Sequence, residues 1–215
     1  MRLAIFGGTF DPPHVGHLLA ASDAFEHLSL DRLIFVPAAV QPLKTGRVVT
    51  PAAHRLAMVK LLTARDDRFE TDSVEVDRDG LSYSVETLRG FAKQYPTAER
   101  FFLVGADILA TFAQWKEPRD VLALATLAVL TRRDEGGTAA VATPEPAPKA
   151  PSNHYESNEE TALQTELRRR TVLVPTRRID VSSTEIRDRV RCNRSIHGFV
   201  TDAVAGYISS HGLYR

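Results

Sequence analysis

Two glycines and two histidines near the start of the chain have the types and spacing needed to bind an anion. Residues 7–17 read Gly-Gly-Thr-Phe-Asp-Pro-Pro-His-Val-Gly-His. The paired glycines, Gly7 and Gly8, let the backbone turn sharply and approach a ligand with no Cβ in the way. If a helix begins near His14, then His14 and His17 share one face of its first turn. Two imidazoles beside the N–H groups of a helix N-terminus predict a phosphate site.

Other phosphate and cofactor sites need different spacings. The chain has no Gly-x-x-x-x-Gly-Lys-Ser/Thr, which excludes a P-loop, and no Gly-x-Gly-x-x-Gly after its first strand, which excludes the dehydrogenase fingerprint. A glycine turn with two surface histidines remains an alternative. A metal site with Asp11, His14 and His17 as ligands is another, although it would need supporting partners.

Composition limits the partners and the compartment. The 215 residues include 27 Lys and Arg and 27 Asp and Glu, so no overall charge attracts nucleic acid or an acidic membrane. Cys192 is the only cysteine, which excludes an intramolecular disulfide and fits a reducing cytoplasm. The first residues form a strand pattern rather than a signal peptide, and no apolar run reaches the length of a membrane span. We expect a soluble, cytoplasmic protein with no nucleic-acid or membrane partner.

The elements that must position these residues alternate between apolar runs and helical patterns. Strands are predicted at Arg2–Phe6, Arg32–Val36, Phe69–Thr71, Arg100–Val104, Leu127–Thr131 and Val172–Val174. Helices are predicted at Val15–His27, Ala52–Ala64, Val85–Gln94, Ile108–Phe112, Asp120–Ala125, Glu159–Arg170, Ser183–Arg191 and Thr201–Ser210. This alternation predicts a doubly wound α/β domain over residues 1–215, with a mostly parallel, Rossmann-like sheet and helices on both faces. Ligands of such sheets bind at the carboxyl ends of the strands.

One segment interrupts the alternation. Residues 134–153 are rich in Gly, Ala, Thr and Pro, with prolines at 144, 146, 148 and 151. Such a composition cannot build a packed core, so we expect a flexible insertion with polyproline character. A tolerated surface insertion is favoured over a lid that covers the site.

Several motifs, in matching order, resemble the nucleotidyltransferase superfamily that carries the H-x-G-H motif. Residues 7–17 resemble its first signature, and Val181–Arg187 (Val-Ser-Ser-Thr-Glu-Ile-Arg) resembles its second, I-S-S-T-x-I-R. Ser82–Leu88, Gly105–Asp107 with Trp115, and the ending Tyr207–Tyr214 resemble the bacterial nicotinate mononucleotide adenylyltransferases in particular. The chain departs from that family in having Pro42-Leu43 before Lys44, where His often precedes the lysine, and Ser84, where Thr is frequent.

The resemblance implies transfer of the adenylyl group of ATP to nicotinate mononucleotide, with Mg²⁺ arriving together with ATP. The attacking phosphate is already an anion at pH 7, so no general base has to create a nucleophile. Catalysis would then consist of positioning the reactants and neutralising charge on the phosphates.

The resemblance also assigns roles to residues. His14, His17 and Arg187 would be catalytic. The ATP site would contain Gly7, Gly8, Thr9, Phe10, His17, Ser182, Ser183, Thr184 and Arg187. The acceptor site would contain Tyr83, Ser84, Gly105, Asp107 and Trp115, and Lys44 with Arg132 or Arg133 are the candidates for the mononucleotide phosphate. From the residues alone, a core aromatic is as well supported for Trp115 as a stacking role, and Asp107 also suits a helix N-cap.

Three rival functions remain at this point. The first is another adenylyl- or cytidylyltransferase, such as one that acts on phosphopantetheine. The others are a metal-dependent hydrolase using Asp11, His14, His17 and Asp107, and a silent nucleotide-binding module. The sequence leaves open the preference for the acid or the amide mononucleotide, and whether the protein forms a homo-oligomer.

Overall fold

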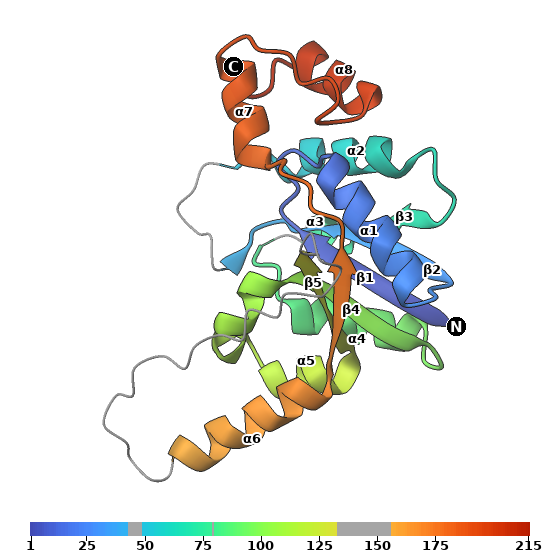
Figure 1. Cartoon of the computed structure of the whole chain (residues 1–215), viewed down its shortest axis with the longest axis vertical. Helices are drawn as coiled ribbons and strands as arrows, with labels where there is room; N and C mark the ends of the chain where they lie inside the picture. The colour runs from blue at the N-terminus through green and yellow to red at the C-terminus, as the bar shows by residue number, and fades with distance from the viewer. Residues whose placement is uncertain (43–48, 79, 133–155) are drawn as a thin grey trace.

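The computed structural model describes residues 1–42, 49–78, 80–132 and 156–215. Its six strands are β1 (Arg2–Gly8), β2 (Arg32–Pro37), β3 (Phe69–Thr71), β4 (Glu99–Gly105), β5 (Thr126–Arg132) and β6 (Thr171–Thr176). They form one sheet in the order β3-β2-β1-β4-β5-β6, and every neighbouring pair is parallel. The strand order reverses between β1 and β4, which is where doubly wound sheets bind ligands. The predicted fold class is confirmed (Figure 1).

Strand β1 shows why this sheet is buried on both faces. Successive side chains of a strand point to opposite faces. Ala4 and Phe6 accordingly pack into one hydrophobic core, whereas Leu3 and Ile5 pack into the other. All four are buried, so the strand reads in the sequence as a continuous apolar run.

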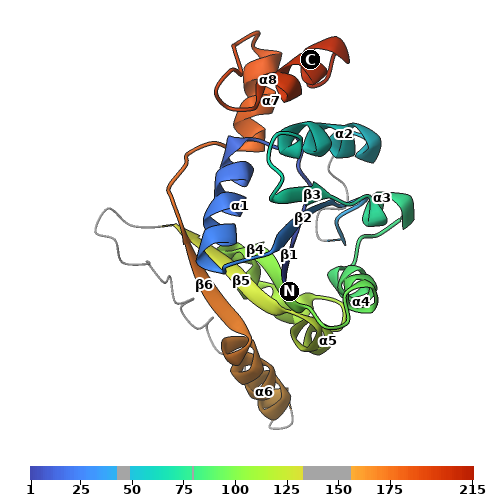
Figure 2. The same ribbon diagram turned by 90° about the vertical axis from the view of Figure 1, so that its right-hand side faces the viewer.

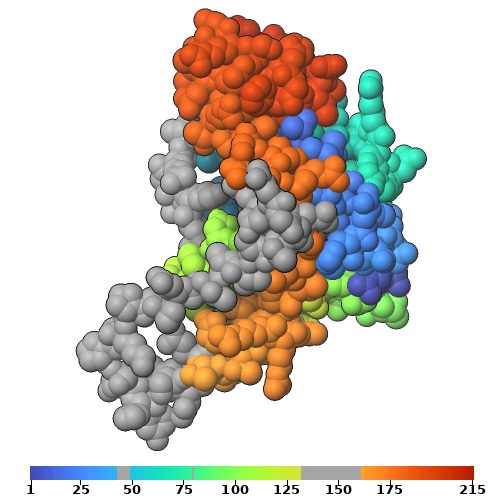
Figure 3. All heavy atoms as spheres, viewed as in Figure 1, coloured from blue at the N-terminus to red at the C-terminus, as the bar shows by residue number. Residues whose placement is uncertain are grey.

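Helices cover both faces of the sheet (Figure 2), and their buried side chains divide between these two cores. Those that supply side chains to the core of Ala4 and Phe6 are α1 (Val15–His27), α2 (Ala52–Thr63), α7 (Ser183–Arg191) and α8 (Asp202–Ser210). Those on the other face are α4 (Ser84–Gln94), α5 (Pro118–Leu124) and α6 (Glu156–Arg169). The residues that follow β6 gather at one end of the molecule in the space-filling view (Figure 3).

The structure corrects the sequence prediction at two short segments. Helix α3 (Val74–Arg78) is not among the predicted elements, because five residues are too few for an apolar pattern to repeat. It begins where the Asp72 carboxylate accepts the backbone N–H of Val74 at 2.8 Å. The helix predicted at Ile108–Phe112 is instead a pair of 3₁₀ helices, η2 (Ala106–Ala110) and η3 (Phe112–Gln114).

Two further predictions concern membrane-spanning helices and the insertion. Within the ranges that the structure describes, no helix is both long and apolar enough to cross a bilayer. The insertion predicted at residues 134–153 lies outside the described residues.

Candidate active site

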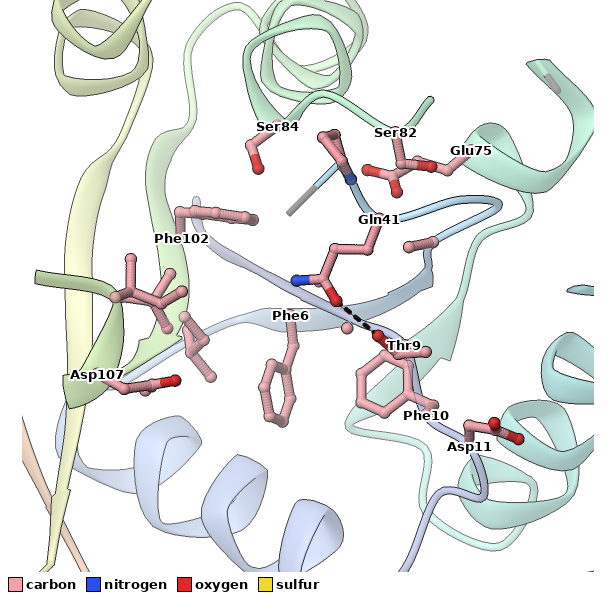
Figure 4. A pocket seen from close by; sticks show the side chains of 18 of the residues that line it. Phe6, Thr9, Phe10, Asp11, Gln41, Glu75, Ser82, Ser84, Phe102 and Asp107 are labelled. Carbon is pink, nitrogen blue, oxygen red and sulfur yellow. Dashed lines mark hydrogen bonds between the residues drawn. The ribbon is translucent and has the colours of Figure 1, made fainter. Parts of the chain in front are cut away.

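A cavity of about 520 Å³ opens at the carboxyl ends of β1 and β4, where the strand order reverses (Figure 4). Its walls come from the turn after β1, the ends of β2 and β4, the start of α4, η2 with the segment after η3, and the first turns of α7. The predicted residues among its lining are Gly7, Gly8, Thr9, Phe10, His17, Tyr83, Ser84, Gly105, Asp107, Trp115, Ser183, Thr184 and Arg187. Residues predicted for ATP and residues predicted for the acceptor therefore share one cavity.

The end of β1 and the turn that follows it depend on Gly7 and Gly8, the last two residues of the strand, because aromatic rings lie against them. A Cβ on Gly7 would lie 3.3 Å from the Phe102 ring, and one on Gly8 would lie 2.8 Å from the Phe10 ring. Phe10 itself adopts a left-handed φ of 50°. The Thr9 hydroxyl donates to the Gln41 amide oxygen at 2.7 Å, a bond drawn in Figure 4. The backbone of this turn forms one wall of the cavity.

His14 and His17 take unequal positions. The backbone N–H of His14, the residue before α1, donates to Nδ1 of His17 at 3.2 Å. A neutral imidazole that accepts at Nδ1 carries its proton on Nε2. His17 lines the cavity, whereas His14 is buried beside it, with 3.8 Å between the ring centroids. His17 is therefore the histidine whose Nε2–H can serve as a donor to a ligand in the cavity.

Gly16 makes room for the buried His14 ring. A Cβ at this position would lie 2.9 Å from His14 Nδ1. Burial lowers the pKa of His14 to about 4. Burial, and secondly the neighbouring His14, hold the pKa of His17 well below its ordinary value. Both rings are therefore neutral at pH 7 when the cavity holds no anion.

The second signature lies against the first. The Ser183 hydroxyl donates to the Pro12 carbonyl at 2.8 Å, and Arg187 Nη1 donates to the Asp11 carbonyl at 2.7 Å. Arg187 Nη2 also donates to the Thr184 hydroxyl at 3.1 Å. Since a guanidinium has five N–H donors, others remain for a ligand in the cavity that Arg187 lines.

Ser182 has a different position from its neighbours in the signature. It is the N-cap of α7, and its side chain accepts the backbone N–H of Glu185 at 3.1 Å. It does not line the cavity, so its contribution is to begin the helix that carries Arg187.

The predicted acceptor residues form the opposite part of the cavity. A Cβ on Gly105 would lie 2.6 Å from the Asp107 carboxylate, so the glycine allows that side chain its position. Asp107 lies inside η2, whose N-cap is Gly105, so the N-cap alternative for Asp107 is wrong. The Trp115 ring lies 5.4 Å from the Phe112 ring, and its buried Nε1 has no hydrogen-bond partner among the described residues. Trp115 thus lines the cavity and also packs against core aromatics.

Three predicted acceptor residues are not among the described residues that line the cavity. Lys44 and Arg133 lie outside the described residues. Arg132 is the last residue of β5, where it pairs with Thr176 of β6.

Arg55 is a functional residue that the sequence does not single out, since it lies within the predicted helix Ala52–Ala64 and belongs to no motif. Its side chain is 1% exposed and donates to three carbonyl oxygens, those of Thr9 (2.7 Å), Ala39 (2.9 Å) and Thr50 (2.8 Å). Burial lowers the pKa of Arg55, while Asp11 and Tyr214 act in the opposite direction. The only sequence signal for this role is that Arg55 is a single arginine among the apolar residues of the buried face of α2.

Glu75 is a second buried charged residue that the sequence did not single out. Helix α3 places it at the cavity wall, where the Thr87 hydroxyl donates to its carboxylate at 2.6 Å. Burial raises the pKa of Glu75, and the bond from Thr87 partly opposes that effect. In Figure 4, Glu75 lies beside Ser82 and near Ser84, so it supports the wall where α4 begins.

The metal alternative has no support in this geometry. Across the described ranges, no three His, Cys, Asp or Glu side chains gather in a way that could hold a metal ion. The Asp11 carboxylate instead accepts the Tyr214 hydroxyl at 2.7 Å and the Thr50 N–H at 3.3 Å.

This chain matches one protein family over most of its length and is similar in sequence to proteins that share one description. A model of the cytidylyltransferase-like family matches residues 5–189. A protein of Gemmatimonas aurantiaca, described as "Probable nicotinate-nucleotide adenylyltransferase", is 45% identical over all of this chain and 93% of its own length. A Thermus thermophilus protein with the same description is 40% identical over the full length of both.

Solved structures resemble the fold. The chain matches Plasmodium falciparum nicotinic acid mononucleotide adenylyltransferase complexed with NaAD, with a TM-score of 0.70 at 15% identity. The match covers 99% of this chain and 97% of the other. At that identity the likeness concerns the arrangement of the strands and helices.

Proposed function

Because this chain belongs to the cytidylyltransferase-like family, we propose that it is a nicotinate-nucleotide adenylyltransferase of NAD biosynthesis. It transfers the adenylyl group of ATP to nicotinate mononucleotide and releases pyrophosphate, forming deamido-NAD. The observation that carries the proposal is the single cavity, which combines the H-x-G-H turn and Arg187 with Tyr83, Asp107 and Trp115. We propose that the whole chain acts as one domain, since this cavity draws on residues from Phe6 to Arg187.

In the proposed reaction, a phosphate oxygen of the mononucleotide attacks the α-phosphorus of ATP. The bond from that phosphorus to the bridging oxygen of pyrophosphate breaks, and the oxygen leaves with the electron pair. The nucleophile is already ionised, so the protein supplies position and charge rather than a base. His17 Nε2–H and the Arg187 guanidinium are the groups suited to stabilise the negative charge on the α-phosphate and on the leaving pyrophosphate. His14 acts through His17, by fixing which ring nitrogen of His17 carries the proton.

The backbone of the glycine turn and the start of α7 complete the proposed ATP site. Gly7, Gly8, Thr9 and Phe10 bring main-chain groups to the phosphates, and Ser183 and Thr184 approach from the opposite side. Mg²⁺ would enter with ATP and neutralise part of the triphosphate charge. Because no described group of side chains could hold a metal, phosphates and water are its expected ligands.

The acceptor would lie between the start of α4 and η2. Trp115 and Tyr83 supply aromatic surface for the pyridine ring, and Ser84, Gly105 and Asp107 supply polar contacts. Lys44 with Arg132 or Arg133 remain the predicted contacts of the mononucleotide phosphate. The cytoplasm, a compartment compatible with the exposed free Cys192, is the expected location, and a homo-oligomer remains a prediction.

The test is to incubate the protein with ATP and Mg²⁺ and to offer nicotinate mononucleotide, nicotinamide mononucleotide or phosphopantetheine in turn. Formation of pyrophosphate and dinucleotide is followed together. We expect strong preference for the nicotinate form. Preference for the amide would keep the chemistry and contradict the assigned acceptor, whereas turnover with phosphopantetheine alone would support the rival transferase.

A further inference from the structure

Tyr214, in the segment after α8, reaches the turn that carries the phosphate-binding residues. Its hydroxyl donates to Asp11 Oδ1 at 2.7 Å, although 203 positions separate the two residues. Burial raises the pKa of Tyr214 far above its ordinary range, so the hydroxyl keeps its proton and acts as a donor. Tyr214 adopts a left-handed φ of 64°, a conformation that non-glycine residues seldom take. The fold therefore holds this side chain in place against Asp11.

Asp11 connects three segments of the chain. One carboxylate oxygen accepts from Tyr214, and the other accepts the backbone N–H of Thr50, just before α2. Its main-chain carbonyl accepts from Arg187 of α7. Asp11 lines the cavity, and Figure 4 shows its side chain turned away from the Thr9–Gln41 pair, towards its protein partners.

The turn needs such support because it is irregular. Residues 9–14 belong to no helix or strand, and Phe10 has a left-handed φ of 50°. Their positions depend on side chains from distant elements, namely Arg55 on Thr9, Ser183 on Pro12 and Arg187 on Asp11. A shift of the backbone at Asp11, which the bonds to its carboxylate restrain, would move the carbonyl that accepts from the Arg187 guanidinium.

We propose that Tyr214 is a positioning residue for adenylyl transfer: its hydroxyl fixes Asp11, whose carbonyl in turn sets where Arg187 presents its remaining N–H groups to the nucleotide phosphates. The inference rests on the proposed function of this cavity. Tyr214 does not line the cavity, so its effect reaches the substrate only through Asp11 and Arg187.

The test compares two conservative variants of tyrosines near the same end of the chain. Tyr214→Phe keeps the ring and removes the bond to Asp11. Tyr207→Phe is the matched control, since its hydroxyl lies 2.9 Å from His54 Nδ1 and does not contact the turn. We expect Tyr214→Phe to weaken ATP binding and to lower kcat/KM for ATP by about tenfold or more, because a small misplacement of a group at the reacting centre can cost up to about 100-fold. The KM for the mononucleotide should stay unchanged, and Tyr207→Phe should match the wild type.

A double-mutant cycle identifies the path. If Tyr214 acts through the Asp11 carboxylate, then adding Asp11→Asn to Tyr214→Phe should cause much less loss than the two single changes predict by addition. Thermal unfolding of each variant shows whether it is folded at the assay temperature. A purely structural role would lower the unfolding midpoint and leave the ATP constants unchanged.

Three results would overturn the inference: ATP constants of Tyr214→Phe equal to those of the wild type, an equal loss in Tyr207→Phe, or fully additive effects in the cycle. These failures differ from failure of the proposed function, in which the wild type itself shows no adenylyl transfer. ATP binding by calorimetry, measured without any acceptor, keeps the two questions separate.

Discussion

His17 and His14 resemble each other in the sequence but differ in the structure. His17 lines the cavity with its proton on Nε2, whereas His14 is buried and donates its backbone N–H to Nδ1 of His17. Hydrogen-bond donors that are aimed in advance at developing negative charge are among the largest contributions to catalysis. We infer that His17 stabilises the negative charge on the phosphates, and that the backbone N–H of His14 fixes the tautomer of His17.

Two substitutions of His17 by amide side chains distinguish the roles of its two ring nitrogens. An asparagine can accept from the His14 N–H near the position of Nδ1 but offers no donor at the position of Nε2. A glutamine places its amide nearer to the position of Nε2. We expect His17→Asn to lower kcat by about 100-fold or more, and His17→Gln to retain more activity. Turnover at saturating ATP and nicotinate mononucleotide measures this, and wild-type turnover in His17→Asn would contradict the assigned donor.

The individual residues of the site were only partly predictable. The motif residues stand out because their types and spacing lie within a few positions of one another. Arg55 could not be recognised, because its three acceptors, at Thr9, Ala39 and Thr50, meet only when the ends of β1 and β2 fold over α2. Glu75 was missed for the same reason, since its partner Thr87 belongs to a different helix.

At the scale of elements, the strands were predictable and the short helices were not. Strands buried on both faces appear as continuous apolar runs, and the predicted runs match the six strands to within a residue or two. Helix α3 and the 3₁₀ helices η2 and η3 are held by local hydrogen bonds, such as Thr111 N–H to Ile108 O at 3.0 Å, rather than by an apolar period. These irregular elements supply Glu75 and Asp107 to the cavity wall, so the least predictable backbone lies next to the site.

Arg55 links α2 to the turns that follow β1 and β2. A methionine would fill much of the same space but would leave three carbonyl oxygens without their donor. Each buried unpaired group costs about 1–3 kcal/mol, so we expect Arg55→Met to lower the free energy of unfolding by about 3 kcal/mol or more. Arg55→Lys should recover only part of this, because an ammonium cannot reproduce the guanidinium fork. Urea unfolding provides the measurement.

Arg65, an exposed residue just after the same helix, gives the matched control. Arg65→Met should change the free energy of unfolding by about 0.5 kcal/mol or less. Equal effects of the two substitutions would mean that the bonds from Arg55 to the carbonyl oxygens contribute nothing to stability.

For the whole molecule, topology explains why residues far apart in sequence share one cavity. All strands are parallel, so their carboxyl ends lie along one edge of the sheet. After β1 the chain continues to β2 on one side, and after β4 it continues to β5 on the other side. The segments that follow β1 and β4 therefore diverge and leave space between them. The sequence predicted the parallel sheet, but the order of its strands depends on pairings between distant segments that no local pattern records.

The buried histidines link the stability of the whole fold to pH. Folding lowers the pKa of His14 from 6.5 to about 4, so between these values the unfolded chain binds more protons than the folded chain. The contribution of His14 is therefore fully present above pH 6.5 and is lost as the pH falls towards 4. At about 1.4 kcal/mol for each pKa unit, the expected loss is about 3 kcal/mol. His17 acts in the same direction, whereas Glu75, whose pKa is raised by burial, opposes part of the loss.

Replacing His14 by glutamine isolates this contribution, because glutamine does not titrate. We expect the free energy of unfolding of the wild type, measured in urea without ATP, to fall more steeply than that of His14→Gln as the pH decreases from 6.5 to 4. The variant should start lower, since it disturbs the packing against His17, and the two curves should converge at the acidic end. Parallel curves would mean that His14 titrates in the folded protein as it does in the unfolded chain. In that case the His14 ring would be accessible to solvent rather than held neutral beside His17.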